Sequence, residues 1–309
     1  MRVHVEAPGP PGHGVRRHAA RVAELVEASA RSGRSGPADL THAQFTDALW
    51  GPDVATAADA FERRAAALPR PLVVTLHDLP GADPDPRRDA RRTAGYRRVA
   101  VRADLVIVSA RHEAAKARAF GADPSVIPLP LPSVGAPGPR PAWADRPTVV
   151  VLGFVYPGKG HAEAIAAAAA QTRPPRVVAA GAVSPGHEPL WMELGDRAAA
   201  AGVELVLTGP LGDADLVAAA RAATVPVAPN RGVSASGSLL TWIACGRVPF
   251  ATRGAYAQEI AEDHPRHIRL HEPGGLAAAI AGAGDTRADP PGWPDVGALH
   301  HRAYERASC

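Results

Sequence analysis

VVVLGFVYPGKGHAEAI, residues 149–165, contains the clearest unit of local structure in this chain. Its first four residues are apolar, which is typical of a parallel strand that is buried on both faces. The glycine-rich loop that follows leads into an alanine-rich segment of helical period. The pattern predicts a strand–loop–helix unit, with Gly153 at the end of the strand and Lys159 immediately before the helix.

The same alternation of strands and helices runs along the 309 residues. In the first half we expect strands at 2–6, 39–43, 72–76, 105–109 and 125–129, and helices at 15–31, 54–67, 87–102 and 111–121. A segment rich in proline and glycine, 130–147, interrupts the pattern. The second half predicts strands at 148–152, 176–180, 204–208, 224–228 and 248–251, and helices at 161–171, 188–201, 214–222, 238–245, 255–262 and 275–281. The fold class is therefore expected to be α/β, with two doubly wound Rossmann-like domains at 1–135 and 146–290, and a last helix at 295–307.

Composition excludes several classes of protein. Hydrophobic residues make up 46% of the chain and charged residues 21%, which excludes a wholly disordered chain. The two cysteines, Cys245 and Cys309, are too few for a disulfide scaffold or a cysteine zinc site. No apolar run approaches the ~20 residues of a membrane span, and the first residues lack the apolar core of a signal peptide, so we expect a cytoplasmic protein. The net charge of +3 does not indicate a nucleic-acid partner.

Lysine is rare in this chain. Of 34 basic residues only Lys116 and Lys159 are lysines, and the rest are arginines. Ligands of open α/β sheets bind at the carboxyl ends of strands, where helix N-termini offer free amide groups. Lys159 would stand at such a place beside the strand end at Gly153, so we interpret it as a phosphate-binding ammonium. Lys116 lies within a predicted helix and is interpreted as part of its solvated face.

A serine-rich loop follows the strand predicted at 224–228. Ser234, Ser236, Gly237 and Ser238 precede an apolar helix, which is a second arrangement suited to an anion such as a diphosphate. The alternative interpretation is an ordinary helix cap, because serine is a frequent N-cap residue.

Two features of the first half fall at strand ends. The loop PGPPGHGV, with Gly12 and Gly14, could admit a phosphate or a sugar close to the backbone, although a plain tight turn explains it equally well. His77 follows an apolar strand in VVTLHDLPG, where an imidazole can bond a hydroxyl group or transfer a proton; a structural histidine is the alternative.

Two charged segments are less specific. DPDP at 83–86 could suggest carboxylates paired on a metal, but its prolines and the adjacent arginines favour a solvated loop. The helix at 87–102 carries seven arginines. This face could meet an anionic acceptor or anionic lipid, but a solvated arginine face is the preferred interpretation.

Together these segments resemble the retaining, nucleotide-sugar-dependent GT-B glycosyltransferases of the family 4 type. The resemblance rests on the order and spacing of the first glycine loop, VVTLHDLPG, ADLVIVSARHEAAKARAFGADPSVIPLPLP, VLGFVYPGKGHAEAI, LVLTGPLGDADLVAAARAATVPVAPN, SASGSLLTWIACGRVPFAT and GWPDVGALHHRAYER. It spans nearly the whole chain and implies a GT-B fold, with two domains that face each other across a cleft. The helix at 295–307 would pack back on the N-terminal domain.

The resemblance also implies roles for single residues. The phosphate lysine of the family falls on Lys159 and its sugar-contacting histidine on His77, and these two are the expected catalytic residues. The expected donor-binding residues are Gly12, Gly14, Gly153, Lys159, Leu211, Ser234, Ser236, Gly237, Ser238 and Thr241, with the nucleobase near Leu211. Neither a metal nor a cofactor is expected, since fixed donors and the lysine would neutralise the leaving diphosphate.

The chain departs from the family pattern at three positions. Phe154 stands where many members carry an arginine, and Val233 and Thr241 stand where members carry a pair of glutamates. The serine loop could substitute by binding phosphates, and the sequence does not identify which residue would replace the contact to the ribose.

The expected function is transfer of a sugar from a nucleotide diphosphate sugar to an acceptor, with retention of configuration. The acceptor could be a small molecule, a glycan or a lipid-linked molecule, and a weak peripheral contact with a membrane would suit the last of these. The alternative is a non-catalytic nucleotide-sugar-binding or partner subunit, because the glutamate pair is missing. A Rossmann-type dehydrogenase is disfavoured because no G-x-G-x-x-G follows a strand.

Overall fold

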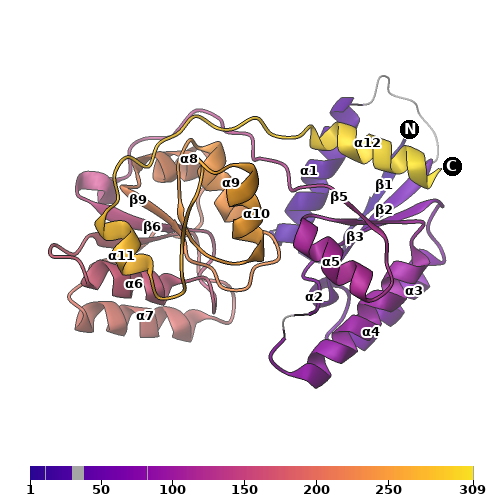
Figure 1. Ribbon diagram of the computed structural model, residues 1–309, viewed down its shortest axis with the longest axis horizontal. Helices are drawn as coiled ribbons and strands as arrows, with labels where there is room; N and C mark the ends of the chain where they lie inside the picture. The colour runs from indigo at the N-terminus through magenta and orange to yellow at the C-terminus, as the bar shows by residue number, and fades with distance from the viewer. Residues whose placement is uncertain (11, 30–37, 82, 309) are drawn as a thin grey trace. The chain divides into compact units, whose positions relative to one another are not determined.

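The computed structural model describes residues 1–10, 12–29, 38–81 and 83–308 and divides into two compact units (Figure 1). The first unit comprises Met1–Pro130 and Trp293–Cys309, and the second comprises Leu131–Gly292. Each unit is built on one parallel sheet with helices on both faces, which confirms the predicted fold class.

The first unit holds a five-stranded parallel sheet in the order β1-β2-β3-β4-β5. Its strands are β1 (Val3–Glu6), β2 (Leu40–Phe45), β3 (Leu72–Leu76), β4 (Leu105–Val108) and β5 (Pro124–Val126). Its helices are α1 (Gly14–Ser29), α2 (Asp47–Trp50), α3 (Val54–Ala65), α4 (Pro86–Arg102), α5 (Arg111–Ala119) and α12 (Val296–Ala307).

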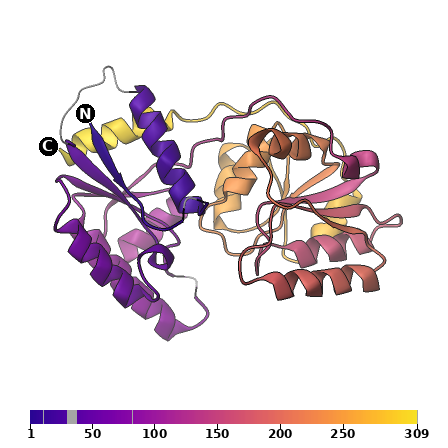
Figure 2. The same ribbon diagram turned by 180° about the vertical axis from the view of Figure 1, so that it is seen from behind.

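Alternate residues of these strands build two separate cores. Ala43, Phe45 and Leu76 point to the face that α3, α4 and α5 cover. Leu40 and Val73 point to the opposite face, which α1 and α12 cover (Figure 2). Because the strands follow one another in sheet order while α1 and α3 lie on opposite faces, the β1–β2 crossover has the opposite hand to the β2–β3 crossover.

The last helix of the chain belongs to the first unit. Asp295 caps α12 by accepting a hydrogen bond from the backbone N–H of Ala298 at 2.9 Å. The preceding Trp293 donates its indole N–H to the carbonyl of Leu129 at 2.9 Å. The helix packs on α1 and buries Val296 and Tyr304 in the core.

The second unit holds a six-stranded parallel sheet in the order β11-β10-β9-β6-β7-β8. Its strands are β6 (Thr148–Leu152), β7 (Arg176–Ala180), β8 (Leu205–Leu207), β9 (Val225–Ala228), β10 (Phe250–Thr252) and β11 (Arg269–His271). Its helices are α6 (His161–Ala169), α7 (Glu188–Ala200), α8 (Asp213–Ala222), α9 (Gly237–Ala244), α10 (Ala255–Asp263) and α11 (Leu276–Ala281), together with the short 3₁₀ helix η1 (Ala142–Asp145). Figure 1 shows α6, α7 and α11 on one face of this sheet and α8, α9 and α10 on the other.

The strand order of the second unit reverses at β6. The chain moves from β6 outward to β7 and β8, and then returns to place β9 on the other side of β6. Such a reversal leaves a crevice at the carboxyl ends of the two central strands, which is where open α/β sheets bind ligands. The loops after β6 and β9 are therefore the first place to look for a site.

Candidate functional site

Lys159 lies at the carboxyl end of β6, in the loop that leads to α6. Its side chain is only 4% exposed, and its Nζ donates a hydrogen bond to Oγ of Ser238 at 2.8 Å. Ser238 belongs to the first turn of α9, which follows β9. The predicted lysine and the predicted serine loop are thus in direct contact at the strand reversal of the second unit.

Glycine shapes the loop around this lysine at two positions. Gly153 has a φ of +102°, and a side chain there would begin 3.4 Å from Nζ of Lys159. Gly160, with a φ of +95°, lies so close to Pro229 that an added Cβ would come within 2.5 Å of its carbonyl oxygen. Both positions need glycine, because left-handed backbone and close approach disfavour any side chain.

The serine loop forms a capped helix N-terminus. Ser236 is the N-cap of α9, and its Oγ accepts the N–H of Leu239 at 3.2 Å. Its hydroxyl also lies 3.3 Å from that of Ser238. The space beside Gly237 is open, since an added Cβ would meet no atom within 4 Å. A helix cap and anion binding are compatible at this loop, because the first amides of a helix stay available to a ligand.

The charge of Lys159 is not matched by the protein. Within the described residues no carboxylate forms an ion pair with it, and burial lowers its pKa to about 8. The nearest acidic residue in sequence, Glu163 in the first turn of α6, is paired instead with Arg231 at 2.5 Å. A buried ammonium without a counter-ion is costly, and an anion beside it would offset that cost.

His161, the first residue of α6, is a second buried titratable group close to Lys159. Its ring is 2% exposed, and neither nitrogen has a hydrogen-bond partner among the residues that the structure describes. Burial first, and then the charge of Lys159, lower the pKa of His161 to about 4. The imidazole is therefore neutral at pH 7 and does not compete with Lys159 for an anion.

The remaining predicted donor residues of the second unit lie at the same edge of the sheet. Thr241 is in α9, and its hydroxyl donates to the carbonyl of Gly237 at 2.9 Å. Its side chain therefore bonds the backbone of its own helix. Leu211 follows β8, which lies two strands from β6 in the sheet, and it is partly exposed. Ser234 lies in the loop between β9 and α9 and is also partly exposed.

His77 lies in the first unit, directly after β3. Its backbone N–H donates to the carbonyl of Phe45 at 2.8 Å, and its Nε2 lies 2.8 Å from Oε1 of Gln44. The ring keeps some exposure to solvent, yet the surrounding protein lowers its pKa to about 4, mainly through loss of hydration. His77 is therefore a neutral imidazole at pH 7.

The backbone at His77 is held in an unusual conformation. Asp78 has a φ of +52°, which residues other than glycine adopt rarely. Tyr96 donates its hydroxyl to the carbonyl of His77 at 2.7 Å, and Arg92 donates to the carbonyl of Asp78 at 2.7 Å. Thr46 donates to the Asp78 carboxylate at 3.0 Å. These contacts hold the backbone at Asp78 in a conformation of the kind that clusters at functional sites.

The first glycine loop lies in the same unit. Gly14 begins α1, and a Cβ added at Gly12 or Gly14 would meet no atom within 4 Å. His18 of α1 packs its ring on that of His77, with centroids 5.4 Å apart. The start of α1 and the end of β3 therefore lie at one edge of the sheet.

Several residues around His77 and β9 were not predicted from the sequence. Gln44, Arg92, Tyr96 and His18 surround His77, and Asn230, whose Oδ1 is buried without a described partner, follows β9. A signal for Gln44 was present: His42 and Gln44 are polar residues with a spacing of two in a strand whose six residues are all buried. That pattern indicates polar groups inside a core.

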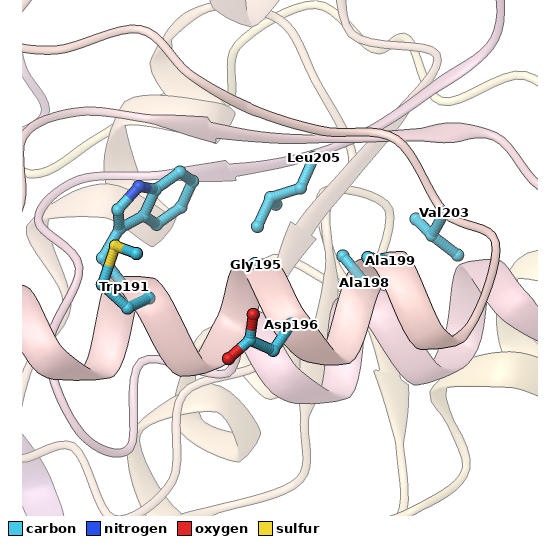
Figure 3. A pocket seen from close by; sticks show the side chains of 8 residues that line it. Trp191, Gly195, Asp196, Ala198, Ala199, Val203 and Leu205 are labelled. Atoms are coloured by element: carbon cyan, nitrogen blue, oxygen red, sulfur yellow. The ribbon is translucent and has the colours of Figure 1, made fainter.

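Two hollows lie elsewhere in the structure. One of about 390 Å³ lies between α7 and β8 and is lined by Trp191, Met192, Gly195, Asp196, Ala198, Ala199, Val203 and Leu205 (Figure 3). Another of about 540 Å³ lies between β5 and α12, with Ser125, Arg302 and Arg306 in its wall. Neither is lined by a predicted site residue.

Two further searches cover the described part of the chain. None of its helices is long and apolar enough to cross a membrane. Among residues 1–10, 12–29, 38–81 and 83–308, no group of three or more His, Cys, Asp or Glu side chains could hold a metal ion.

Several solved structures share this architecture. HepE from Anabaena, solved in complex with UDP-glucose, is 18% identical over 98% of this chain and 77% of its own, with a TM-score of 0.62. AviGT4, a glycosyltransferase involved in avilamycin A biosynthesis, is 17% identical over 100% of this chain and 98% of its own, with a TM-score of 0.60. Sucrose-phosphate synthase from Thermosynechococcus elongatus is 19% identical over 87% of this chain and 69% of its own, with a TM-score of 0.57.

These likenesses confirm the predicted fold: the chain has the GT-B fold of glycosyltransferases, built from two Rossmann-like units. No known family profile matches the chain. No curated protein matches it in sequence either.

Proposed function

We propose that the chain is a glycosyltransferase that moves a sugar from a nucleotide diphosphate sugar to an acceptor. The observation that carries this proposal is the buried ammonium of Lys159, which bonds Ser238 at the N-terminus of α9 and has no carboxylate partner among the described residues. The arrangement provides a cation and helix amides at one point, as a diphosphate requires.

The proposed chemistry follows from where charge develops. When the bond between the anomeric carbon and the diphosphate oxygen breaks, the bonding electrons stay on the diphosphate, which becomes more negative. The Lys159 ammonium, the Ser238 hydroxyl and the first amides of α9 would stabilise that charge more strongly in the transition state than in the bound donor. The reaction as proposed needs neither a metal ion nor a cofactor.

The shared fold suggests the class of donor. HepE was solved with UDP-glucose, and AviGT4 and sucrose-phosphate synthase are also GT-B proteins by their structures. A UDP-hexose is therefore the first donor to test, with Leu211 proposed near the base. Retention of configuration and the family 4-like character rest on the resemblance in sequence, and His77 would contact the transferred sugar.

The acceptor is expected at the first unit. Four of the seven arginines of α4 bond acidic groups: Arg88 with Asp83, Arg92 with Asp47, Arg98 with Asp59 and Glu62, and Arg102 with Glu62. Arg87, Arg91 and Arg97 are exposed and have no ion-pair partner in the described chain. This remaining charge would suit an anionic or lipid-linked acceptor and a weak contact with anionic lipid.

A second candidate function is nucleotide-sugar binding without catalysis. Its basis is that Val233 and Thr241 stand where the resembled family carries two glutamates, and that Thr241 bonds only its own helix. Such a protein would bind the donor but would not release free nucleotide diphosphate.

Two measurements test the proposal in turn. Thermal-shift assays with UDP, GDP, ADP and dTDP, each alone and as sugar conjugates, should give one base that stabilises the protein, by roughly 2.7 kcal/mol at 100 times its dissociation constant. Release of the nucleotide diphosphate from the best donor, measured with and without a chelator, then separates the two candidates. Binding without release would favour the non-catalytic subunit, and no shift with any nucleotide would contradict both.

A further inference from the structure

Strand β2 places two polar side chains inside the core of the first unit. His42 and Gln44 are both 0% exposed and, being two residues apart, lie on the same face of the sheet. The same face carries the apolar Leu40 and packs against α1 and α12. Buried polar groups are costly unless they are fully bonded, so this pair calls for a reason beyond packing.

The amide of Gln44 joins two histidines. Its Oε1 lies 2.8 Å from Nε2 of His77, and its Nε2 lies 3.0 Å from Nε2 of His42. A carbonyl oxygen can only accept a hydrogen bond and an amide NH₂ can only donate one. His77 must therefore carry its proton on Nε2, and His42 must accept at Nε2.

The hydrogen bonds of His42 at the other end of this network also have a defined direction. Nε2 of His42 also lies 2.7 Å from the hydroxyl of Thr75 on β3, and its Nδ1 lies 2.8 Å from the hydroxyl of Tyr304 on α12. Since Nε2 of the neutral His42 accepts, Nδ1 carries the proton, and this N–H donates a hydrogen bond to the hydroxyl oxygen of Tyr304. The order of donors and acceptors is thus set from α12 through β2 to the end of β3.

Gln44 acts on the ring of His77, whereas other residues hold the backbone. Tyr96 and Arg92 bond the carbonyls of His77 and Asp78 but do not touch the imidazole. With its proton on Nε2, the ring keeps Nδ1 as its acceptor, and the described chain gives that atom no partner. Nδ1 is therefore the nitrogen that would meet a hydroxyl of a bound ligand.

We propose that Gln44 is a positioning residue for His77: it fixes the ring orientation and the Nε2–H tautomer, and it is itself oriented by His42, Thr75 and Tyr304. The contact of His77 with a sugar rests on the proposed function, whereas the tautomer can be tested without it. A role for Gln44 in packing alone would predict no effect on the tautomer.

The direct test is nitrogen NMR of the full chain labelled with ¹⁵N-histidine, with the His77→Ala spectrum used to identify the His77 signals. The wild type should show His77 as a single neutral tautomer with the proton on Nε2. An Nδ1–H tautomer, or a mixture, would overturn the assignment.

Two substitutions at Gln44 should have different effects on the tautomer of His77. Gln44→Glu keeps an acceptor for His77 but removes the donor to His42, so His77 should stay Nε2–H while His42 moves its proton to Nε2. The new carboxylate should also raise the pKa of His77, whose other charged or titratable neighbours, Asp78, His13 and His18, are unchanged. Gln44→Leu should leave His77 as a mixture of tautomers. An unchanged His77 spectrum in both variants would refute the proposal.

A control variant is available on the same strand. Thr41 is also 0% exposed but points to the opposite face from Gln44. Thr41→Val should leave the nitrogen signals of His77 unchanged, and a change there would mean that any disturbance of β2 reaches His77.

Kinetic measurements provide a second test of the positioning role of Gln44. Gln44→Leu should lower kcat about tenfold with little change in KM for the donor, the effect of one lost hydrogen bond. In a His77→Ala background the same substitution should cost nothing further. A tenfold loss of kcat both in the wild type and in the His77→Ala background would show that Gln44 acts through stability, and it would overturn the proposal. If the wild type shows no turnover, the proposed function fails, and the NMR result still decides the positioning role.

Discussion

Replacing Lys159 by methionine would separate the charge of its side chain from its volume. The side chain is 4% exposed, so alanine would leave a cavity, whereas methionine would fill most of the space. Burial lowers the pKa of Lys159 to about 8, which means that folding carries a cost of about 3 kcal/mol to keep the charge at pH 7. We therefore expect the free energy of unfolding of Lys159→Met to be unchanged or higher.

Turnover should change in the opposite direction. An ammonium about 4 Å from a phosphate charge is worth about 4 kcal/mol at an effective dielectric constant of 20. Phe154 stands where the resembled family carries an arginine, so no second cation of this segment shares the task. Losing one preorganised donor of this kind lowers kcat roughly a hundredfold to a thousandfold. Lys159→Arg should recover only part of the rate, because a planar guanidinium does not replace a compact ammonium.

The assay is steady-state release of nucleotide diphosphate from the parent and the methionine, alanine and arginine variants, with circular dichroism and thermal unfolding to compare folds. Lys116→Ala, at the only other lysine of the sequence, is the matched control and should keep the parent's rate. A methionine variant that folds normally and turns over within about threefold of the parent would refute the diphosphate assignment.

Three further predictions follow from the same contacts. His77→Ala should lower kcat more than it lowers nucleotide affinity, because the residue would touch the sugar; an equal loss in both, measured by kinetics and calorimetry, would argue against that contact. Gly237→Val should weaken nucleotide binding at least tenfold without unfolding the protein, since its Cβ meets only open space, whereas Gly195→Val, at an equally open glycine of α7, should bind normally. With a pKa of about 8 for Lys159, kcat/KM should fall as the pH rises through 8, because the ammonium loses its proton. Over the same interval and up to about 10.5 the stability of the wild type should rise, because only the unfolded chain still holds the proton, and Lys159→Met should lack this rise.

The sheets were largely predictable from the sequence because their strands are apolar runs. β6 (Thr148–Leu152), β7 (Arg176–Ala180) and β3 (Leu72–Leu76) have the predicted bounds. β11 (Arg269–His271) was not predicted, because an arginine and a histidine flank its one leucine and no apolar run marks it. The one-turn helix α2 (Asp47–Trp50) is too short to show a helical period.

The contact between Lys159 and Ser238 could be anticipated for a topological reason. Both follow strands of one parallel sheet, and the carboxyl ends of such strands meet at one edge. The surroundings of His77 could not be anticipated, because they depend on register. Gln44 lies 33 residues earlier, and it reaches His77 because β2 pairs with β3 so that Gln44 stands opposite Thr75.

The position of α12 has a consequence for the order in which the chain acquires its structure. Tyr304 bonds His42 across 262 residues of sequence, whereas the second unit is continuous from Leu131 to Gly292. During synthesis on the ribosome, all five strands of the first unit emerge before α12, which covers Leu40, Val73 and Ile107 together with α1. The second unit can thus complete its core while the first still exposes an apolar face, and the unit that is made first is finished last.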